Sequence, residues 1–440
     1  MRRAGLVALA TALAGVLVGG AACPASSAAA AEPAWGVVDS TCAPDRLAAQ
    51  RAAGLQIAVV DAHWDRLQPV PGAFDREAAD GLAARITRCL DAGMRVVLGS
   101  GAQYPPSWVR DLPDALLRDQ RGGVPRTGAV DLVFGASPRA ALDDYLTRLV
   151  AAVPADRLTG IRVGTSAAGE IGYPGPHESG YGFNSWWAFS GPAQGTAPLA
   201  PGQRPAPMPG WVPGSAQWSG GAATAVGAGE WFGWYSGALV EALAAQARVL
   251  RGAGFTGEVH LPVPGRGVLP ADRSVAMGSL LDGHGERDGA LGRGLDYVAA
   301  MPGIRDAVPG PVVIDLTSVD DATAVRARAL DPPEDTCRPD DPAASLEPTV
   351  RVERWSNLRF ARAQASRAGL PVVGENPGPP GETTGGSDDS DPEIEQVRRA
   401  PGYARDCGLA AFTLAFEEDL HTPRSGVTLA DYVGAITGNS

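Results

Sequence analysis

Two glutamates stand directly after apolar stretches of the chain. Glu170 follows the segment 160–164 across a run of small residues, and Glu375 ends the apolar segment 371–374. Small residues allow a tight turn that presents a carboxyl group at the end of a strand. Two carboxyl groups that flank one bond can cleave a glycosidic linkage, because one protonates the leaving oxygen while the other attacks the sugar or activates water. We therefore interpret Glu170 and Glu375 as a catalytic pair of carboxyl groups.

Other assignments of these carboxyl groups stay open. Each glutamate could instead pair with an arginine or cap a helix, which is the usual role of a single strand-end glutamate. Asp320 follows another apolar segment, 311–316, and is an alternative base. A Ser–His–Asp triad is not supported, because the chain has no GxSxG motif.

Further polar and aromatic residues near predicted strand ends could contact a sugar. Sugar rings present apolar C–H faces that stack on aromatic side chains, and six of the ten tryptophans lie within residues 186–234. Trp231 and Trp234 have the i, i+3 spacing of one helix face, so they could equally be core residues. The candidate substrate-binding residues are Asp61, Trp64, Gln103, Tyr173, Trp186, Trp187, His260, Asn376 and Glu418.

The composition excludes several other chemistries. All 37 basic residues are arginines, so Schiff-base catalysis and a P-loop lysine are excluded. The net charge of −12 argues against binding to a nucleic-acid backbone, which needs clustered cations. Five histidines occur without HExxH or CxxC motifs, so we expect neither a metal nor an organic cofactor.

The elements that must position these residues alternate along the chain. Apolar strands separated by helical stretches indicate a parallel sheet that is buried on both faces. Eight such strands predict an α/β fold, a (β/α)8 TIM barrel, in which strands four and seven face each other. The predicted strands are 35–39, 56–61, 94–99, 160–164, 257–261, 311–316, 371–374 and 409–415. The predicted helices are 44–53, 76–92, 138–153, 232–253 and 351–368.

Long loops are predicted after strand four, over 171–229, and after strand seven, over 376–399. Both would lie at the carboxyl ends of the strands, where barrel active sites are built. We expect the first loop to roof the site and to contribute Trp186 and Trp187 to substrate binding.

Residues 1–31 are typical of a secretory signal segment, and residues 32–440 are expected to form one catalytic domain. Arg2 and Arg3 precede a short apolar run, which is too short for a membrane-spanning helix. No later segment could span a membrane. Cys23 leaves a lipid anchor open, although the residues before it are a poor lipobox. We therefore expect a secreted protein.

Four cysteines remain after residue 31, an even number that favours disulfides in an oxidising compartment. Four cysteines allow three connectivities, and pairing cannot be deduced from sequence alone. We predict Cys42–Cys89, because neighbouring outer helices of a barrel could bring the two together. The second predicted pair, Cys337–Cys407, would tie the loop after strand six to the helix before strand eight.

Several of these segments resemble the β-amylase family of glycoside hydrolases over most of residues 55–420. The most diagnostic stretch is Gly-Thr-Ser-Ala-Ala-Gly-Glu-Ile-Gly-Tyr-Pro at 164–174, whose glutamate matches that family's catalytic acid and maps to Glu170. Further similar segments are 59–64, 105–109, 229–235, 373–376 and 412–420. The resemblance implies a TIM-barrel enzyme that cleaves O-glycosidic bonds of an oligo- or polysaccharide.

Two segments resemble the retaining barrel β-galactosidases instead. Residues 375–378 are similar to the nucleophile region of those enzymes, and residues 65–74 to their strand-two segment. This resemblance implies a retaining exoglycosidase as an alternative function, with Glu375 as nucleophile. A catalytically inactive barrel that binds polysaccharide is the alternative from another class.

Overall fold

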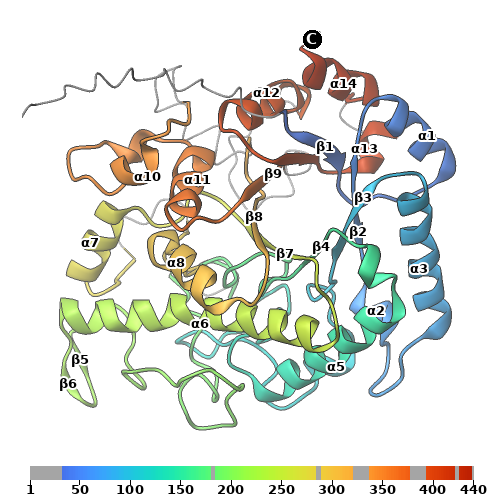
Figure 1. The fold of residues 1–440 in the computed structure, drawn as a ribbon. Coiled ribbons are helices and arrows are strands. Elements are labelled where there is room, and N and C mark those ends of the chain that lie inside the picture. Colours follow the sequence, from blue (N-terminus) through green and yellow to red (C-terminus); the bar gives the residue numbers. More distant parts are fainter. Residues whose placement is uncertain are drawn as a thin grey trace, which may run out of the picture. The chain divides into compact units, whose positions relative to one another are not determined.

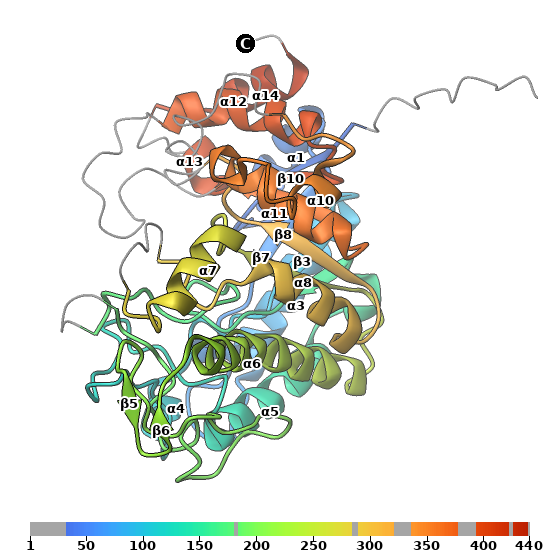
Figure 2. The same cartoon turned by 90° about the vertical axis from the view of Figure 1, so that its left-hand side faces the viewer.

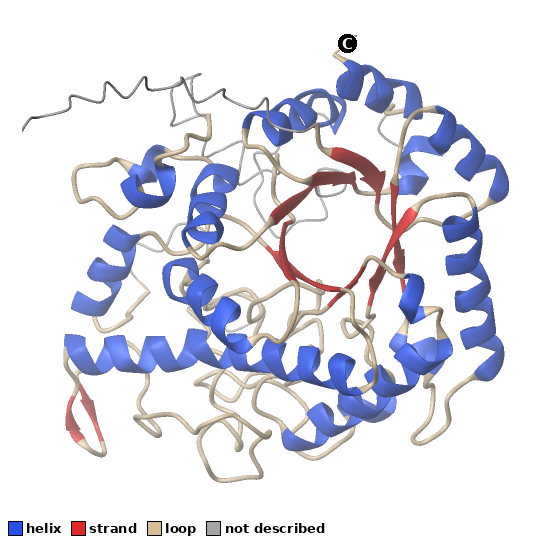
Figure 3. Ribbon diagram, viewed as in Figure 1, coloured by secondary structure: helices blue, strands red, loops and turns tan. Residues whose placement is uncertain are grey.

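Eight parallel strands close into a barrel in the computed structural model, with helices arranged around it (Figure 1; Figure 3). The order around the barrel is β1, β2, β3, β4, β7, β8, β9 and β10 before it returns to β1. This confirms the predicted TIM barrel and its eight strands. Their bounds are β1 Ala34–Val37, β2 Ile57–Asp61, β3 Arg95–Gly99, β4 Gly160–Arg162, β7 Glu258–Val263, β8 Val312–Leu316, β9 Val372–Asn376 and β10 Ala411–Leu414.

The structure describes residues 32–179, 184–283, 289–320, 336–376, 393–421 and 426–438. Residues Glu32–Ser440 form one compact unit. The predicted signal segment and Cys23 lie outside the described residues, as does most of the predicted loop after strand seven.

Most helices occupy the connections between successive strands. Their bounds are α1 Pro44–Ala52, α2 Trp64–Leu67, α3 Arg76–Asp91, α4 Ser107–Arg110, α5 Ala136–Ala152, α6 Ala225–Gly252, α7 Pro270–Gly278, α8 Tyr297–Ala307, α10 Asp341–Ala344, α11 Asn357–Arg367, α12 Glu393–Asp406, α13 Glu417–His421 and α14 Leu429–Thr437. The five predicted helices correspond to α1, α3, α5, α6 and α11. Helices α8 and α12 escaped prediction because each contains an internal proline, Pro302 and Pro401, followed by glycine.

The residues of each strand alternate between the helix-covered outside and the bore of the barrel. The outward residues, such as Val259 and Leu261, join the large core shared with the helices. The bore is filled by a smaller apolar cluster that includes Ile57, Val59 and Val97. Nearer the carboxyl ends of the strands the inward positions become charged, and this change is where the candidate site begins.

The connection after β4 is long and carries a short hairpin of its own, β5 Gln217–Trp218 and β6 Gly221–Ala222, just before α6 (Figure 2). Helix α6 begins at a Thr224 cap, whose side chain accepts a hydrogen bond from the Gly227 N–H. Helix α6 has 28 residues and is long enough for the connection after β4 to pack along it.

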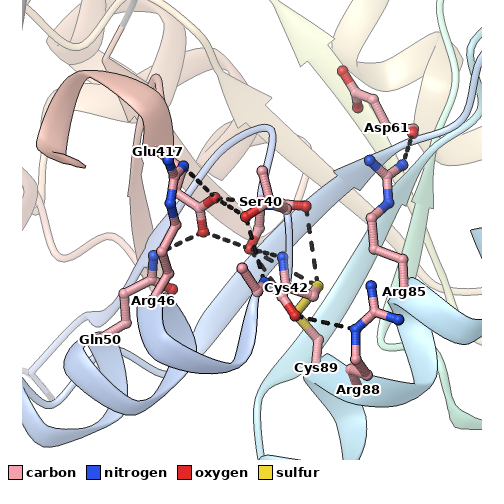
Figure 4. The surroundings of a disulfide bond; sticks show 11 residues. Ser40, Cys42, Arg46, Gln50, Asp61, Arg85, Arg88, Cys89 and Glu417 are labelled. Carbon is pink, nitrogen blue, oxygen red and sulfur yellow. Dashed lines mark hydrogen bonds and ion pairs between the residues drawn. A yellow bond between two sulfur atoms is a disulfide. The ribbon is translucent and has the colours of Figure 1, made fainter. Parts of the chain in front are cut away.

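Both predicted disulfides are present. Cys42 is bonded to Cys89 with a Cα–Cα distance of 5.3 Å, and Cys337 is bonded to Cys407 with a Cα–Cα distance of 4.8 Å. Figure 4 shows the first bond joining the segment after β1 to helix α3. Across the described ranges, no helix combines the length and the apolar character that crossing a membrane requires.

Candidate functional site

A tight turn after β4 carries Glu170. Gly169 has a positive φ of +77°, and a side chain at Gly164 would overlap the Gly169 backbone, so the small residues are required here. The Ser166 hydroxyl accepts a hydrogen bond from the Glu170 N–H at 3.2 Å and holds the turn closed. The chain thereby presents the Glu170 carboxyl group at the carboxyl end of the barrel.

Two partners hold the Glu170 carboxyl group. The Thr317 hydroxyl donates a hydrogen bond to Oε1 at 2.5 Å, and Arg293 Nη2 lies 3.1 Å from Oε2. The Glu170 side chain remains 16% exposed, so a ligand could reach it. Neither partner is close in sequence, and only the fold brings them to this glutamate.

Glu375 lies on β9 and its side chain turns into the bore, where Arg162 of β4 donates a hydrogen bond to Oε2. The same Arg162 nitrogen lies 2.6 Å from Asp315 Oδ2 on β8. Burial raises the pKa of Glu375 to about 7, and the negative charges of Asp315 and Asp61 reinforce the rise while Arg162 opposes it. Glu375 is thus a buried carboxyl group that can exchange a proton near neutral pH.

One backbone segment, 317–319, contacts both glutamates. Thr317 bonds the Glu170 side chain, and the Val319 N–H donates to the backbone oxygen of Glu375 at 3.2 Å. The segment directly follows β8, whose end lies between those of β7 and β9 in the barrel order. The segment 317–319 thus connects the side chain of Glu170 to the backbone of Glu375 at the carboxyl ends of the strands.

An exposed aromatic pair lies at the ends of β2 and β3. His63 stacks on Tyr104 with ring centroids 4.4 Å apart, and the Asp65 N–H donates to the Tyr104 carbonyl at 2.9 Å. Tyr104 is 37% exposed. The neighbouring Gln103 amide lies against Gly169 of the Glu170 turn. Both side chains of this pair are therefore partly open to solvent, and the adjacent Gln103 reaches the Glu170 turn.

Asp61, the last residue of β2, lies against Gly99 of β3, where any side chain would collide with its carboxyl group. Burial raises the pKa of Asp61, and Arg162 opposes the rise. Asp61 and Gln103 are therefore predicted sugar contacts whose described side chains lie near Glu375 and the Glu170 turn, respectively.

The predicted role of four aromatic residues in substrate binding is corrected by their burial, because none of them presents a face to solvent. Trp64 packs on Tyr145 with centroids 5.2 Å apart, and Trp186 meets Trp231 edge to face at 5.5 Å. The loop after β4 packs aromatic side chains against α6 as part of the large apolar core. The corrected residues are Trp64, Tyr173, Trp186 and Trp187, all 0–1% exposed.

The remaining candidate site residues lie in parts of the structure that differ from one residue to the next. His260 is buried in the bore, with Nε2 3.2 Å from Glu258, so its predicted sugar contact is also corrected. Glu418 lies on α13, where its carboxylate accepts a hydrogen bond from Arg46 at 2.8 Å. Asn376 ends β9, and its side chain lies outside the described residues. Asp320 is buried and is bonded by Arg399 of α12 at 3.1 Å.

Sequence reasoning missed the residues that hold the two carboxyl groups. Arg293 and Thr317 stand in loops without a recognisable pattern. Arg162 did carry a signal, because it is a charged residue inside an otherwise apolar strand, and Asp315 interrupts β8 in the same way. Among the described residues, no group of three or more His, Cys, Asp or Glu side chains is arranged to hold a metal ion.

Comparison with known proteins bears on this site. A family model for β-galactosidase, glycoside hydrolase family 42, matches residues 39–152. No curated protein matches the chain. Among solved structures, the catalytic domain of a β-amylase from Paenibacillus polymyxa is similar over 94% of this chain and 100% of its own, with 15% identity and a TM-score of 0.60.

Two β-galactosidase structures are also similar. The enzyme from Marinomonas ef1 has a TM-score of 0.54 at 14% identity, and that from Halorubrum lacusprofundi has 0.53 at 16%. Each match covers 92% of this chain but only 58% and 57% of those proteins, so the chain spans little more than half their length. The comparisons confirm both predicted resemblances and the barrel fold, and they support the prediction of a glycosidase.

Proposed function

We propose that this protein is a glycoside hydrolase that cleaves O-glycosidic bonds of an oligo- or polysaccharide, with Glu170 and Glu375 as the paired carboxyl groups. The observation that carries the proposal is their placement: both stand at the carboxyl ends of barrel strands and both contact the segment 317–319. Paired carboxyl groups at this end of a TIM barrel are what glycosidic cleavage requires.

The roles of the pair can be assigned in two ways. The resemblance to β-amylases makes Glu170 the acid, and the resemblance to retaining β-galactosidases makes Glu375 the nucleophile, with Asp320 as the alternative base. A specific observation favours the exchange of these roles: a pKa of about 7 suits Glu375 as a proton donor at neutral pH. Glu170, in contrast, is ion-paired with Arg293.

One experiment tests both the activity and the roles. The wild type, Glu170→Ala and Glu375→Ala are assayed on aryl glycosides and on a panel of polysaccharides, with and without azide. Azide restores turnover to a variant whose nucleophile is missing, because the small anion occupies the vacated space. The variant that lacks the acid keeps activity only on substrates with a good leaving group, which needs no protonation.

The matched control is Glu353→Ala, which removes an exposed glutamate paired with the surface residue Arg351. It should keep wild-type turnover. Near-normal turnover in both active-site variants would overturn the assignment, and loss of activity in Asp320→Asn instead would move the base to Asp320. If the wild type binds polysaccharide but releases no sugar, the protein is a sugar-binding barrel.

The proposal includes secretion. Residues 1–31 have the composition of a signal segment, and two disulfides are compatible with an oxidising compartment. N-terminal sequencing of protein recovered from the medium should begin near Glu32. A mature chain that begins at a lipidated Cys23 would instead indicate a membrane anchor.

A further inference from the structure

A chain of charged side chains runs through the bore of the barrel. It begins at Glu258 of β7, whose Oε2 lies 3.2 Å from Nε2 of His260. The other ring nitrogen of His260 lies 3.9 Å from Asp315 Oδ2, which in turn lies 2.6 Å from Arg162 Nη2. Arg162 then donates to Glu375. Four strands therefore contribute to one row of charged side chains that ends at the proposed catalytic carboxyl group.

Arg162 is the junction of this chain. A single nitrogen, Nη2, contacts a carboxylate oxygen of Asp315 and one of Glu375. The Arg162 side chain is 12% exposed and that of Asp315 is 2% exposed, so water screens their charges little. One buried cation thus contacts two carboxyl groups, and the negative charge of Asp315 offsets part of the effect of the guanidinium on Glu375.

The His260 ring lies next to Asp315, with Nδ1 3.9 Å from Asp315 Oδ2. Burial of His260 would lower its pKa, but Asp315 and Glu258 outweigh that effect and raise it. The histidine is 5% exposed, too buried to meet a sugar, and its ring lies against Gly160, where a side chain would collide with it. Its position supports a role in fixing Asp315.

We propose that Arg162 is a positioning residue for Glu375, and that the charge of Asp315, which lies beside His260, offsets part of the effect of the guanidinium on Glu375. The inference rests on the proposed function, because it assigns Glu375 to the reaction. Arg162 fixes the direction of the carboxyl group at the mouth of the bore. Asp315 keeps the pairing incomplete, so that Glu375 can still take up and release a proton.

The groups that face Glu375 predict shifts of opposite sign. Arg162 stabilises its ionised form, while Asp315 and Asp61 destabilise that form. Asp61 is itself influenced by Arg85 and Asp39. Removal of the arginine charge should therefore raise the pKa of Glu375, and removal of the Asp315 charge should lower it. A purely structural role would not produce two shifts in opposite directions.

The experiment measures the pH profile of kcat/KM for the wild type, Arg162→Gln and Asp315→Asn. In parallel, the Glu375 carboxyl group is titrated by carbon-13 NMR of the full-length protein and is assigned by its absence in Glu375→Gln. The pH profile of kcat/KM contains an inflection that reflects the pKa of Glu375. We expect this inflection to shift to higher pH by about one unit or more in Arg162→Gln and to lower pH by about one unit in Asp315→Asn. The Arg162→Gln change should also lower kcat by roughly 100-fold, as loss of alignment does.

A second buried arginine–aspartate pair supplies the matched controls. Arg359 bonds Asp341 at 2.9 and 3.0 Å, with side chains 10% and 2% exposed, in a different part of the chain. Arg359→Gln and Asp341→Asn should reduce thermal stability but leave the profile unmoved. If Arg162→Gln fails to fold, Arg162→Lys keeps the charge while losing the fixed geometry, and Asp315→Asn still tests the sign.

Shifts in the same direction for Arg162→Gln and Asp315→Asn, or no shift in either, would overturn the inference. A wild type without glycosidase activity would overturn the proposed function instead. In that case the NMR titration alone still decides whether Arg162 and Asp315 act on Glu375 in opposite directions.

Discussion

Two buried glutamates stand near the ends of neighbouring strands and have opposite surroundings. Glu375 lies on β9 and Glu417 shortly after β10. Glu417 accepts hydrogen bonds from side chains of Ser40, Thr41 and Gln50 at 2.6–2.9 Å, as well as from the Thr41 N–H (Figure 4). Glu375 has one arginine, which it shares with another carboxylate.

The pKa values of the two glutamates move apart accordingly. Burial would raise the pKa of Glu417, but its hydrogen bonds, those of Thr41 first, outweigh burial and lower it. Burial raises the pKa of Glu375 to about 7, and Arg162 reverses this only in part. A carboxylate surrounded by donors ties elements together, whereas one left short of donors is suited to proton transfer.

The largest expected effect separates the two glutamates by activity. Glu375→Gln should lower kcat by at least ~1,000-fold, because it removes a group that acts on the reacting bond. Circular dichroism should show an unchanged fold. Glu417→Gln, which touches α1 rather than the site, should keep kcat within a few-fold of the wild type at temperatures where it is folded. Equal losses of kcat in Glu375→Gln and Glu417→Gln would contradict the assignment of a catalytic role to Glu375 and a structural role to Glu417.

The second expected effect is on the free energy of unfolding. Here Glu417→Gln should have the larger effect and Glu375→Gln the smaller one. Glu417→Gln should lower the free energy of unfolding by about 3 kcal/mol, because an amide group would turn its own N–H toward buried donors. Glu375→Gln should change it less, since Asp315 remains to pair with Arg162. Urea denaturation at pH 7 measures both. A larger loss in Glu375→Gln would mean that Glu375, too, is chiefly structural.

The pH dependence of stability should also differ in sign. For Glu417, whose folded pKa is lowered, the stabilisation is present above its unfolded pKa of about 4.3 and is lost as the pH falls through the folded value. For Glu375, whose folded pKa is raised to about 7, stability is lost as the pH rises from about 4.3 toward 7.

Denaturation curves from pH 3 to 8 test both signs. The stability difference between the wild type and Glu417→Gln should shrink at the acid end of the range. That between the wild type and Glu375→Gln should change between about pH 4.3 and 7, in favour of the variant as the pH rises. Parallel curves for the three proteins would contradict both shifts.

The barrel was predictable because its strands are apolar and regularly spaced, and the site was predictable only in part. Glu170 and Glu375 stand where a strand pattern ends, so their positions follow from periodicity. Glu417 stands in a similar place, and nothing local distinguishes it from Glu375. The difference comes from Ser40 and Gln50, more than 360 residues away in sequence, as their separations of 377 and 367 show.

The substrate-binding role predicted for the tryptophans of the loop after β4 was wrong for a related reason. A cluster of tryptophans in a long loop is compatible with a sugar platform or with a packed core, and the choice depends on where α6 lies. Here Trp186 and Trp187 are buried near α6. The exposed ring belongs to Tyr104, a single aromatic that composition does not single out.

The smallest effect tests that exposed ring. Tyr104 stacks on His63 beside the Glu170 turn, and it keeps 37% of its surface in solvent. A sugar stacked on this pair would lose about 1 kcal/mol of binding without the ring, so Tyr104→Ala should raise KM roughly fivefold at nearly constant kcat. Tyr104→Phe keeps the ring and should behave as the wild type does.

Trp234→Ala serves as the contrasting variant, because that ring packs on Phe134 at 5.3 Å in the aromatic core of the α6 region. It should lower the melting temperature and leave KM unchanged. If Tyr104→Ala changes stability but not KM, the His63–Tyr104 pair only ties β2 to β3, and the sugar must meet the barrel on the side of Glu170 and Arg293 instead.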